Sequence, residues 1–362
     1  MLASARGHTR LLQHRLRSLL YPPHTSPLSP QSYSTSSSPP PLSSPPQTIF
    51  SGIQPTGIPH LGNYLGALKT WVTLQNAAPP STKLFFSVVD LHAITLFQQP
   101  DDLRRWRRES LAALLAVGVD ERTSTVFWQG GSKLSLADNT SPLDESSKSK
   151  LKLGLFSYPV LQAADILVHR ATHVPVGEDQ SQHLEFAREC VTNFNHTYNC
   201  SHLVTPQTIL SPTKRIMSLT SPLQKMSKSH PSPLSRILIT DSPSTITTKL
   251  SSALTDSQNL VTWDPVSRPG VSNLLTLLSS FDKHGRSAQE LGGMLEKEGM
   301  GLGAFKKLVA GEVREGLRDV RERFERVLGE KGYVEEVARR GAVRARESAE
   351  ETMVLVREAV GL

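Results

Sequence analysis

The sequence predicts an α/β fold in which a doubly wound parallel sheet precedes a helical C-terminal region. Short apolar runs alternate with segments of helical periodicity from residue 47 to about residue 230. A glycine-rich turn follows the first of these runs, and residues 303–362 have helical periodicity. Alternating strands and helices are typical of parallel sheets, which place their ligands at the carboxyl ends of the strands.

The first strand is predicted at residues 48–53, and a helix over residues 60–75 follows it. The run KLFFSVV at residues 83–89 is rich in aromatic and β-branched residues, which favours a second strand. Pro100 opens a second helix that Gly118 ends, because proline fits the first turn of a helix and glycine its end.

A third strand is predicted at residues 123–128, and another ends near Val176, where a further helix begins. From about residue 232 the pattern becomes helical, first over residues 271–281 and then over residues 303–362. One apolar stripe of the last stretch is read as core, and it consists of Phe305, Leu308, Val313, Leu317, Val320, Phe324 and Val327.

The N-terminal segment has the composition of a mitochondrial transit peptide. It carries Arg6, Arg10, Arg15 and Arg17 among leucines, a serine- and proline-rich stretch follows, and the first acidic residue is Asp90. A disordered basic tail is the alternative. We expect residues 1–46 to be the presequence and linker of a mitochondrial matrix protein, residues 47–230 to form the α/β domain, and residues 231–362 to form the helical region.

Composition limits the function classes. The chain has 362 residues and 38% hydrophobic content, and it has no apolar run of about 18 residues, so we expect no membrane span. Removing the four N-terminal arginines from the net charge of +7 leaves +3, which permits a nucleic-acid partner without demanding one. Cys190 and Cys200 are too few for a zinc site or a disulfide framework, so both are expected to be free thiols.

The turn after the first strand indicates a phosphate site. Glycines there let backbone amides approach a polyanion, and the next helix presents free N–H groups. The turn matches neither the GxGxxG fingerprint nor a Walker A loop. Its candidate residues are Ser51, Gly52, Gln54, Thr56, Gly57, Gly62 and Asn63.

The string KMSKS at residues 225–229 supplies two lysines on one loop. Lys225 and Lys228 would close over a triphosphate and neutralise charge on a leaving pyrophosphate, and His60 would add a donor near the same phosphates. A solvated turn is the alternative for the loop, and an exposed residue at a helix N-terminus is the alternative for His60.

A second constellation lies in the string YPVLQAAD. On a helix Tyr158, Gln162 and Asp165 fall on one side, at positions i, i+4 and i+7. Three polar groups on an otherwise apolar stripe line a pocket or carry a burial penalty, and a pocket is the better account. A carboxylate that accepts from a ring N–H, with a tyrosine and an amide near an ammonium, would recognise an aromatic amino acid.

The string VPVGEDQ at residues 174–180 ends a strand and opens a helix. An acid after a glycine at a strand end is suited to a ribose, and Gln180 would reach the amino group of an amino acid. The alternative is an ordinary helix cap made by Asp179. His169 and His173 are spaced as a metal pair, but no third ligand stands nearby, so no metal site is predicted.

Seven strings in one order resemble the bacterial-type tryptophanyl-tRNA synthetases of the mitochondrial kind, from about residue 47 to residue 362. The strings are FSGIQPTG, HLGNYLGA, VDLHAIT, YPVLQAADIL, VPVGEDQ, RIMSL and KMSKS. The resemblance implies a class I enzyme with a Rossmann-type catalytic domain, an α-helical anticodon-binding domain and a homodimeric state. It also implies L-tryptophan, ATP with Mg²⁺ carried on the nucleotide, and tRNA(Trp) as substrates and partners.

The resemblance further implies roles for individual residues. The catalytic group would be His60, Lys225, Lys228 and Gln54. ATP would be bound by Gln54, Pro55, Thr56, Gly62, Asn63, Gly177, Glu178, Asp179, Ile216, Lys225, Met226, Ser227, Lys228 and Ser229. Tryptophan would be held by Asp165 at the indole N–H, by Tyr158 and Gln180 at the ammonium, and by Phe50, His92, Gln162, Val174 and Val176.

The spacing of Tyr158, Gln162 and Asp165 also resembles tyrosyl-tRNA synthetases, so a tyrosine-specific enzyme is an alternative. A second departure follows Trp128 and Gln129, where the family continues into a helical hairpin and this chain lacks roughly thirty residues, about two average helices and their loop. A lost segment of the gene or a real variant would explain the gap. In the second case the chain would be a synthetase-derived RNA-binding protein with impaired activation.

Overall fold

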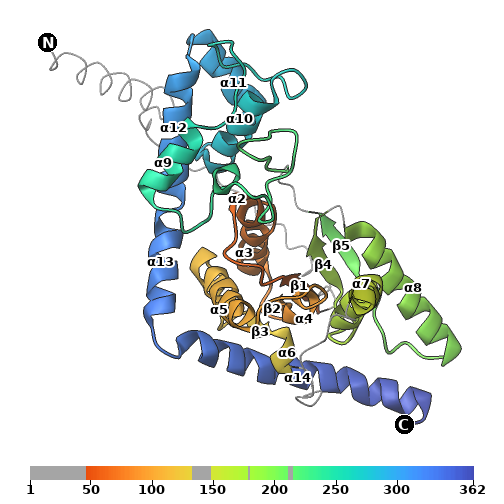
Figure 1. Ribbon diagram of the computed structural model, residues 1–362. Helices are drawn as coiled ribbons and strands as arrows, with labels where there is room; N and C mark the ends of the chain where they lie inside the picture. The colour runs from red at the N-terminus through yellow and green to blue at the C-terminus, as the bar shows by residue number, and fades with distance from the viewer. Residues whose placement is uncertain (1–45, 133–147, 178–179, 211–214) are drawn as a thin grey trace, which may run out of the picture. The chain divides into compact units, whose positions relative to one another are not determined.

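The computed structural model describes residues 46–132, 148–177, 180–210 and 215–362 (Figure 1). Residues 46–362 form one compact unit. The expected transit peptide lies almost entirely outside the described residues, and so do Glu178 and Asp179. The predicted division of the folded part near residue 230 stays a prediction.

The described part of the chain contains a parallel sheet of five strands in the order β3-β2-β1-β4-β5 (Figure 1). The order reverses between β1 and β4, which is the switch point where open α/β sheets bind ligands. The predicted α/β class is therefore confirmed. The strands are β1 (Thr48–Ile53), β2 (Lys83–Val88), β3 (Thr125–Trp128), β4 (His173–Val176) and β5 (Gln207–Leu210).

Two details of the sheet differ from the sequence-based prediction. β3 begins at Thr125 and not at residue 123, because the backbone N–H groups of Thr123 and Ser124 donate to the carbonyl of Asp120 in a turn. The strand β5 was not predicted, since its four residues at the sheet edge are only partly covered and lack a buried run.

The predicted helix over residues 60–75 is present but is interrupted. It consists of α2 (Leu61–Asn63), the π-helical turn η1 (Tyr64–Leu68) and α3 (Lys69–Ala77). A π turn adds a residue to the local repeat and shifts the side chains that follow it around the helix. Trp71 then stacks on Phe86 of β2 with ring centroids 5.0 Å apart, so α3 covers this face of the sheet.

The helix α5 (Pro100–Val117) packs against β2 and β3 and ends at Gly118, as predicted. The short helix α4 (Asp90–Ala93) follows β2, and α6 (Gln129–Ser132) follows β3 directly. Both short helices therefore begin at the carboxyl edge of the sheet.

The opposite face is covered by α7 (Lys148–Leu167), α8 (Ser181–Thr197) and α14 (Tyr333–Val360). Their buried side chains form one core with Phe50, Phe85 and Phe127, which project from adjacent strands. The rest of this core is Ile166, Leu167, Ala171, Val174, Leu184, Val191, Ala342 and Ala345.

The C-terminal region is helical, as predicted. After the short 3-10 turn η4 (Pro233–Ser235), its helices are α9 (Pro243–Ser251), α10 (Pro269–Phe281), α11 (Ala288–Lys297), α12 (Leu302–Gly316), α13 (Arg318–Gly329) and α14. The predicted stripe is core at Phe305, Val313, Leu317, Val320 and Phe324, which are all at most 5% exposed. Leu308 and Val327 are only half-buried.

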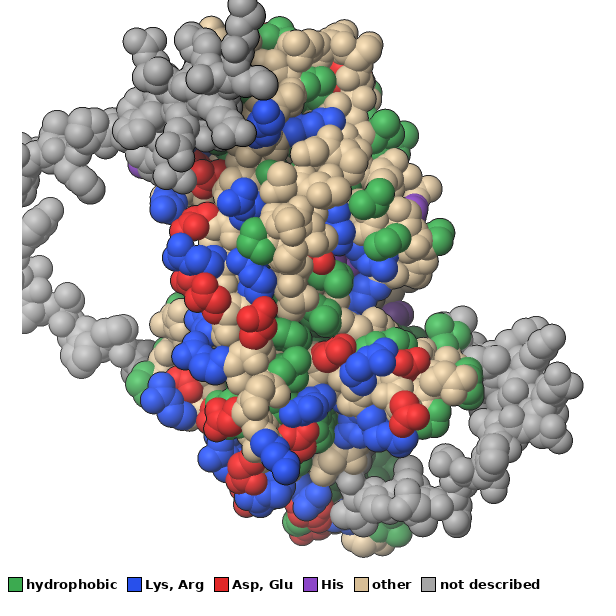
Figure 2. Space-filling view, turned by 60° about the vertical axis from the view of Figure 1, so that its left-hand side comes forward, with side chains coloured by type: hydrophobic (Ala, Val, Ile, Leu, Met, Phe, Trp, Pro, Cys, Tyr) green, Lys and Arg blue, Asp and Glu red, His purple; other side chains and the backbone are tan. Residues whose placement is uncertain are grey.

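Surface charges of both signs are interspersed on the face shown in Figure 2. The helices α5 and α13 pack together, and Arg108 pairs with Glu335 at 3.0 Å to join α5 to α14. Arg318 pairs with Glu315 at 2.8 Å where α12 meets α13. Paired charges of this kind give a weak long-range field, so recognition of a polyanion needs a local group of cations. Within the described ranges, every helix is too short or too polar to cross a bilayer.

The helix α14 approaches the backbone of the edge strand β3 at Gly341. A Cβ atom built on Gly341 would lie 1.8 Å from the carbonyl oxygen of Val126, inside any permitted contact. Ala342 and Ala345 continue this small-residue side of the helix into the core. The packing of α14 on β3 therefore requires a residue without a side chain at position 341.

We expect Gly341→Ala to destabilise the protein by about 2–3 kcal/mol, because α14 must move away from β3. Gly311→Ala is the matched control, since Gly311 is exposed on α12 and a Cβ there meets no atom within 4 Å. The control should gain about 0.5–1 kcal/mol from helix propensity. Urea unfolding of both variants checks this, and equal stabilities would refute the close contact.

Candidate active site

The turn after β1 and the KMSKS loop meet at the carboxyl edge of the sheet. The Nζ atom of Lys228 donates to the carbonyl oxygen of Gly57 at 2.6 Å and to Oγ1 of Thr56 at 3.3 Å. Gly57 has a φ of 98°, a conformation that a side chain would strain. The structure thus brings together two strings that lie more than 170 positions apart.

His60 is buried, so the alternative of an exposed residue at a helix N-terminus is wrong for it. Its Nδ1 atom accepts from the N–H of Asn63 at 3.3 Å, and its own N–H donates to Oδ1 of Asn63 at 3.2 Å, which caps α2. A Cβ at Gly62 would lie 2.9 Å from the His60 ring. The glycine therefore makes room for the buried imidazole.

The imidazole of His60 is neutral at physiological pH. Burial, with a smaller contribution from the positive charges of Lys228, Arg236 and Lys225, lowers its pKa to about 3. Because Nδ1 accepts a hydrogen bond, the single ring proton of the neutral form lies on Nε2. His60 can donate one hydrogen bond from Nε2 and contributes no net charge.

The KMSKS loop is fixed by Met226, which is 1% exposed. Its backbone N–H donates to the carbonyl of Ile216 at 3.0 Å, and Ile216 is itself buried. Ser227 and Ser229 are joined through their hydroxyls at 2.8 Å, and Lys225 is exposed. The buried Met226 anchors the loop, and Lys225 and Lys228 lie before and after it in the sequence.

Burial lowers the pKa of Lys228 to about 8, and the charge of Glu109 opposes this shift while that of Arg236 adds to it. A group of positive charges held at low solvent exposure is the environment expected of a polyanion site. Lys228 is still mostly protonated near pH 7, and a bound anion would stabilise its charged form further.

A second group of polar side chains surrounds Tyr158 on α7. Its hydroxyl accepts from Nε2 of Gln54 at 3.4 Å, so it reaches the turn after β1. The ring of His92 meets the tyrosine ring edge-on at 4.7 Å, and the ring of His183 lies 5.4 Å away. Three elements of the sheet edge therefore converge on this tyrosine.

Asp165 lies about two helical turns after Tyr158 on α7 and is only 4% exposed. Its Oδ2 atom contacts Nε2 of His92 at 2.8 Å and accepts a hydrogen bond from Nε2 of Gln129. A buried carboxylate costs free energy unless such partners are present. The polar residues predicted on one side of α7 therefore include a buried carboxylate that has polar partners.

Gln162 and Gln180 are joined by a histidine. Nδ1 of His183 lies 2.8 Å from Oε1 of Gln162 and 3.1 Å from Oε1 of Gln180. The predicted pair of amides is thus held between α7 and the start of α8. Gly177 is exposed just before this point.

The apolar residues predicted for the site lie in the sheet. Phe50 on β1 and Val174 on β4 belong to the same core, and Val176 packs against it. The hydroxyl of Ser51 donates to the carbonyl of Pro175 at 2.8 Å, which ties β1 to β4 beside this core.

The two histidines considered as metal ligands have other partners. The ring of His169 stacks on Phe50 and Phe85, and Nδ1 of His173 contacts the hydroxyl of Thr172 at 2.9 Å. Among the described residues, no group of three His, Cys, Asp or Glu side chains is placed to hold a metal ion.

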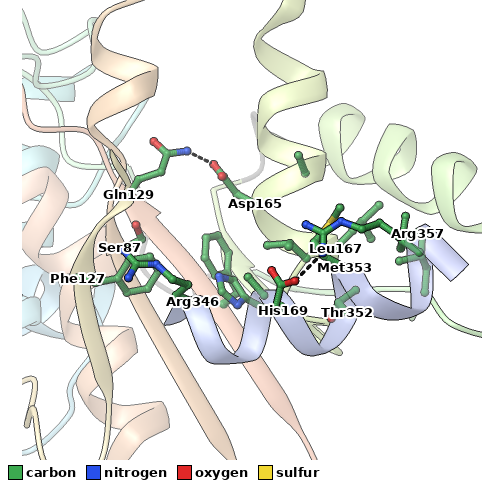
Figure 3. Close-up of a pocket in the computed structure, with 17 residues that line it drawn as sticks. Ser87, Phe127, Gln129, Asp165, Leu167, His169, Arg346, Thr352, Met353 and Arg357 are labelled. Carbon is green, nitrogen blue, oxygen red and sulfur yellow. Dashed lines mark hydrogen bonds and ion pairs between the residues drawn. The ribbon is translucent and has the colours of Figure 1, made fainter. Parts of the chain in front are cut away.

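A cavity of about 370 Å³ lies between the sheet, α7 and α14 (Figure 3). Asp165 and Gln129 form its polar end, while Phe127, Leu167 and Met353 contribute apolar walls.

Sequence reasoning missed Gln129 and His183. Gln129 is the first residue after β3, so its place at a strand's carboxyl end was a signal. His183 stands one helical turn after Gln180, on the same side of α8. Neither signal identifies the hydrogen-bond partners. Gln129 contacts Leu91 and Asp165, 38 and 36 positions away, and His183 contacts Gln162, 21 positions away.

Comparison with known proteins gives the family. The sequence profile described as tRNA synthetases class I (W and Y) matches residues 43–138 and 132–318. This chain belongs to that family. The synthetase match consists of two segments that overlap at residues 132–138, close to the position where a missing hairpin is expected from the sequence.

Relatives of known name span nearly the whole length of this synthetase. The mitochondrial tryptophan–tRNA ligase of Saccharomyces cerevisiae is 38% identical over 87% of this chain and 90% of its own length. The tryptophan–tRNA ligase of Wolinella succinogenes is 40% identical over 87% of this chain and 98% of its own. Bacterial and mitochondrial relatives are therefore equally similar to it.

Solved structures agree with this result. The tryptophanyl-tRNA synthetase of Mycoplasma pneumoniae has a TM-score of 0.72 at 28% identity and covers 87% of this chain and 98% of its own. That of Campylobacter jejuni, complexed with ADP and tryptophan, has a TM-score of 0.68 at 29% identity over 87% of this chain and 100% of its own. A tyrosyl-tRNA synthetase of Aeropyrum pernix, at 20% identity and a TM-score of 0.59, covers 85% of this chain and 90% of its own and shares the fold.

The low pKa of Lys228 predicts how stability depends on pH. The folded protein releases the Lys228 proton near pH 8, whereas the unfolded chain keeps it to about pH 10.4. The unfolded state binds more protons between these values, so the free energy of unfolding should rise with pH there, by about 1–3 kcal/mol.

Lys228→Met should remove this rise, and Lys69→Met, at an exposed position of α3, should keep it. Urea unfolding of the three proteins from pH 7.5 to pH 10.5 measures the difference. Parallel curves for the unsubstituted protein and Lys228→Met would contradict the burial of this charge.

Proposed function

We propose that this synthetase activates L-tryptophan with ATP and transfers it to tRNA(Trp) in the mitochondrial matrix. The relatives at 38% and 40% identity and the structures at 28% and 29% identity described above are named tryptophan–tRNA ligases or tryptophanyl-tRNA synthetases. The observation that carries the proposal is the buried Asp165, which lies between a polar group suited to an amino acid and an apolar core suited to a ring.

Recognition of tryptophan would begin at the indole. The carboxylate of Asp165 would accept from the ring N–H, and the edge-on contact of His92 with Tyr158 would close one side of the ring site. The ammonium would lie near the hydroxyl of Tyr158 and the amide of Gln180. Phe50, Gln162, Val174 and Val176 would complete the walls.

ATP would occupy the carboxyl edge between the first βα turn and the KMSKS loop. Lys228, Lys225 and the Nε2 proton of His60 would meet the phosphates. The ribose would lie near Gly177, and the proposed ribose acid Asp179 lies outside the described residues. The remaining ATP contacts would be Gln54, Pro55, Thr56, Gly62, Asn63, Glu178, Ile216, Met226, Ser227 and Ser229.

The chemistry would be an in-line displacement at phosphorus. An oxygen of the tryptophan carboxylate forms a bond to the α-phosphorus of ATP, and the bond to the β-phosphate oxygen breaks, which releases pyrophosphate. The charged form of Lys228 would be favoured once the phosphates surround it, so it would stabilise the leaving group. A ribose hydroxyl of tRNA(Trp) then attacks the activated carboxyl and releases AMP.

Mg²⁺ would enter with the nucleotide. Hard oxygen ligands of the triphosphate suit this ion, whereas Glu109 is the one carboxylate among the described groups whose charges act on Lys228 or His60. When bound, the ion would neutralise phosphate charge, and the protein residues would align the reacting atoms.

A homodimer is part of the proposal. Ile94, Leu96 and Phe97 follow α4 and are 55%, 57% and 75% exposed. Neighbouring apolar side chains of this size on a surface favour burial against another protein surface. A second copy of the chain would cover them and give the two-fold assembly that the family resemblance implies.

One observation favours a second function. The two segments of the family match overlap at residues 132–138, close to the position where a missing hairpin is expected from the sequence. If that segment is needed for activation, the chain would bind tRNA(Trp) without forming the adenylate.

The matrix assignment rests on the arginine-rich segment at residues 6–17 and on the mitochondrial relatives.

The test is ATP–pyrophosphate exchange by the full chain, with L-tryptophan as substrate and L-tyrosine as the control. We expect exchange with tryptophan and at least about 100-fold less with tyrosine, because a site built for one buried hydrogen bond rejects a ring that leaves it unpaired. Exchange with tyrosine alone would overturn the substrate. A folded chain that binds tRNA(Trp) but exchanges with neither amino acid would establish the second function.

A further inference from the structure

The amide of Gln129 is held in one orientation. The backbone N–H of Leu91 donates to Oε1 of Gln129 at 3.0 Å, and an N–H group can only donate. Oε1 must therefore face Leu91, which leaves the amide Nε2 toward Oδ2 of Asp165, as Figure 3 shows. Gln129 is 2% exposed, so water does not compete with these contacts.

The backbone beside Gln129 is fixed by a buried acid. The N–H of Gly130 donates to Oδ1 of Asp90 at 2.8 Å, and Nε of Arg107 pairs with Oδ2 of the same carboxylate at 2.8 Å. The guanidinium of Arg107 also lies 4.7 Å from the ring centre of Trp128. The start of α6 is thus tied to α4 through Gly130, and Arg107 of α5 contacts both Asp90 and Trp128 beside it.

We propose that Gln129 is a positioning residue that makes the synthetase selective for a ring N–H by fixing the plane of the Asp165 carboxylate. The inference rests on the proposed role of Asp165. Oδ2 of Asp165 is held from two directions, by His92 at 2.8 Å and by Gln129. An acceptor discriminates between substrates only if its oxygen stays where the ring donor arrives.

The cavity next to Asp165 gives Gln129 this importance. Asp165 and Gln129 both line the cavity of about 370 Å³, which extends toward Met353 of α14. Without the amide, the carboxylate keeps its contact with His92 but loses the donor that fixes Oδ2 from the second direction, so it can turn toward that space. The acceptor would then leave the line of the ring N–H, while the apolar walls of the ring site would be unchanged.

The test compares L-tryptophan with 3-(benzothiophen-3-yl)-L-alanine, which has sulfur in place of the ring N–H and a similar shape. Pyrophosphate exchange is measured with both amino acids for the unsubstituted chain, Gln129→Met and Gln129→Glu. We expect Gln129→Met to raise the KM for tryptophan by about 10-fold to 100-fold with kcat changed less than about threefold. The KM for the sulfur analogue should change less than about threefold.

Gln129→Glu should lose the preference for tryptophan over the sulfur analogue at least as strongly, because a second carboxylate repels the carboxylate of Asp165. Gln75→Met is the matched control, since Gln75 also accepts from a backbone N–H, that of Asp120, and donates to the carbonyl of Gly118. It removes a similar amide far from the site and should leave the ratio of the two KM values unchanged.

An unchanged ratio in an active Gln129→Met protein overturns the inference, and so does an equal loss for both amino acids, which indicates a purely structural role. If Gln129→Met does not fold, Gln129→Asn provides the same comparison, because its shorter amide cannot reach both Leu91 and Asp165. Exchange by the unsubstituted chain separates the two proposals: without it the proposed function fails, and with it only the ratio decides on Gln129.

Discussion

The central position of β1 is the constraint on which the rest of the site depends. It pairs in parallel with β2 on one side and β4 on the other, so the segments that follow all three strands emerge at the same edge. The bond from Ser51 to the carbonyl of Pro175 fixes β1 against β4 at the switch point. Residues from the first turn, α4, α7 and α8 can therefore surround one small volume.

Much of this arrangement could be predicted from the sequence. The order of strands and helices gives the sheet, and the parallel-sheet rule then places Gln54 near the polar side of α7. The neutral state of His60 could not be predicted, because it depends on burial and on cations brought in by a distant loop. Gln129 could not be assigned either, since its partners Leu91 and Asp165 lie 38 and 36 positions away.

The electrostatics of the edge show how the protein prepares for an anion. Lys228 is drawn onto the carbonyl of Gly57, and its burial opposes its own charge. His60 stays uncharged beside it, so the site avoids a further repulsive cation while keeping a donor. These two side chains therefore stabilise negative charge that enters or develops at this edge. This suits a reaction in which charge develops on a leaving phosphate.

The contact of α14 with β3 has a consequence for how the chain reaches its native state. The backbone carbonyl of Glu121, just before β3, receives a hydrogen bond from Arg344, 223 positions later, and Gly341 rests on the carbonyl of Val126. During synthesis the edge strand must remain uncovered until α14 has emerged. Long sequence separation slows folding and exposes unpaired edges, so a chaperone that shields this edge would matter most while the C-terminal helices are still missing.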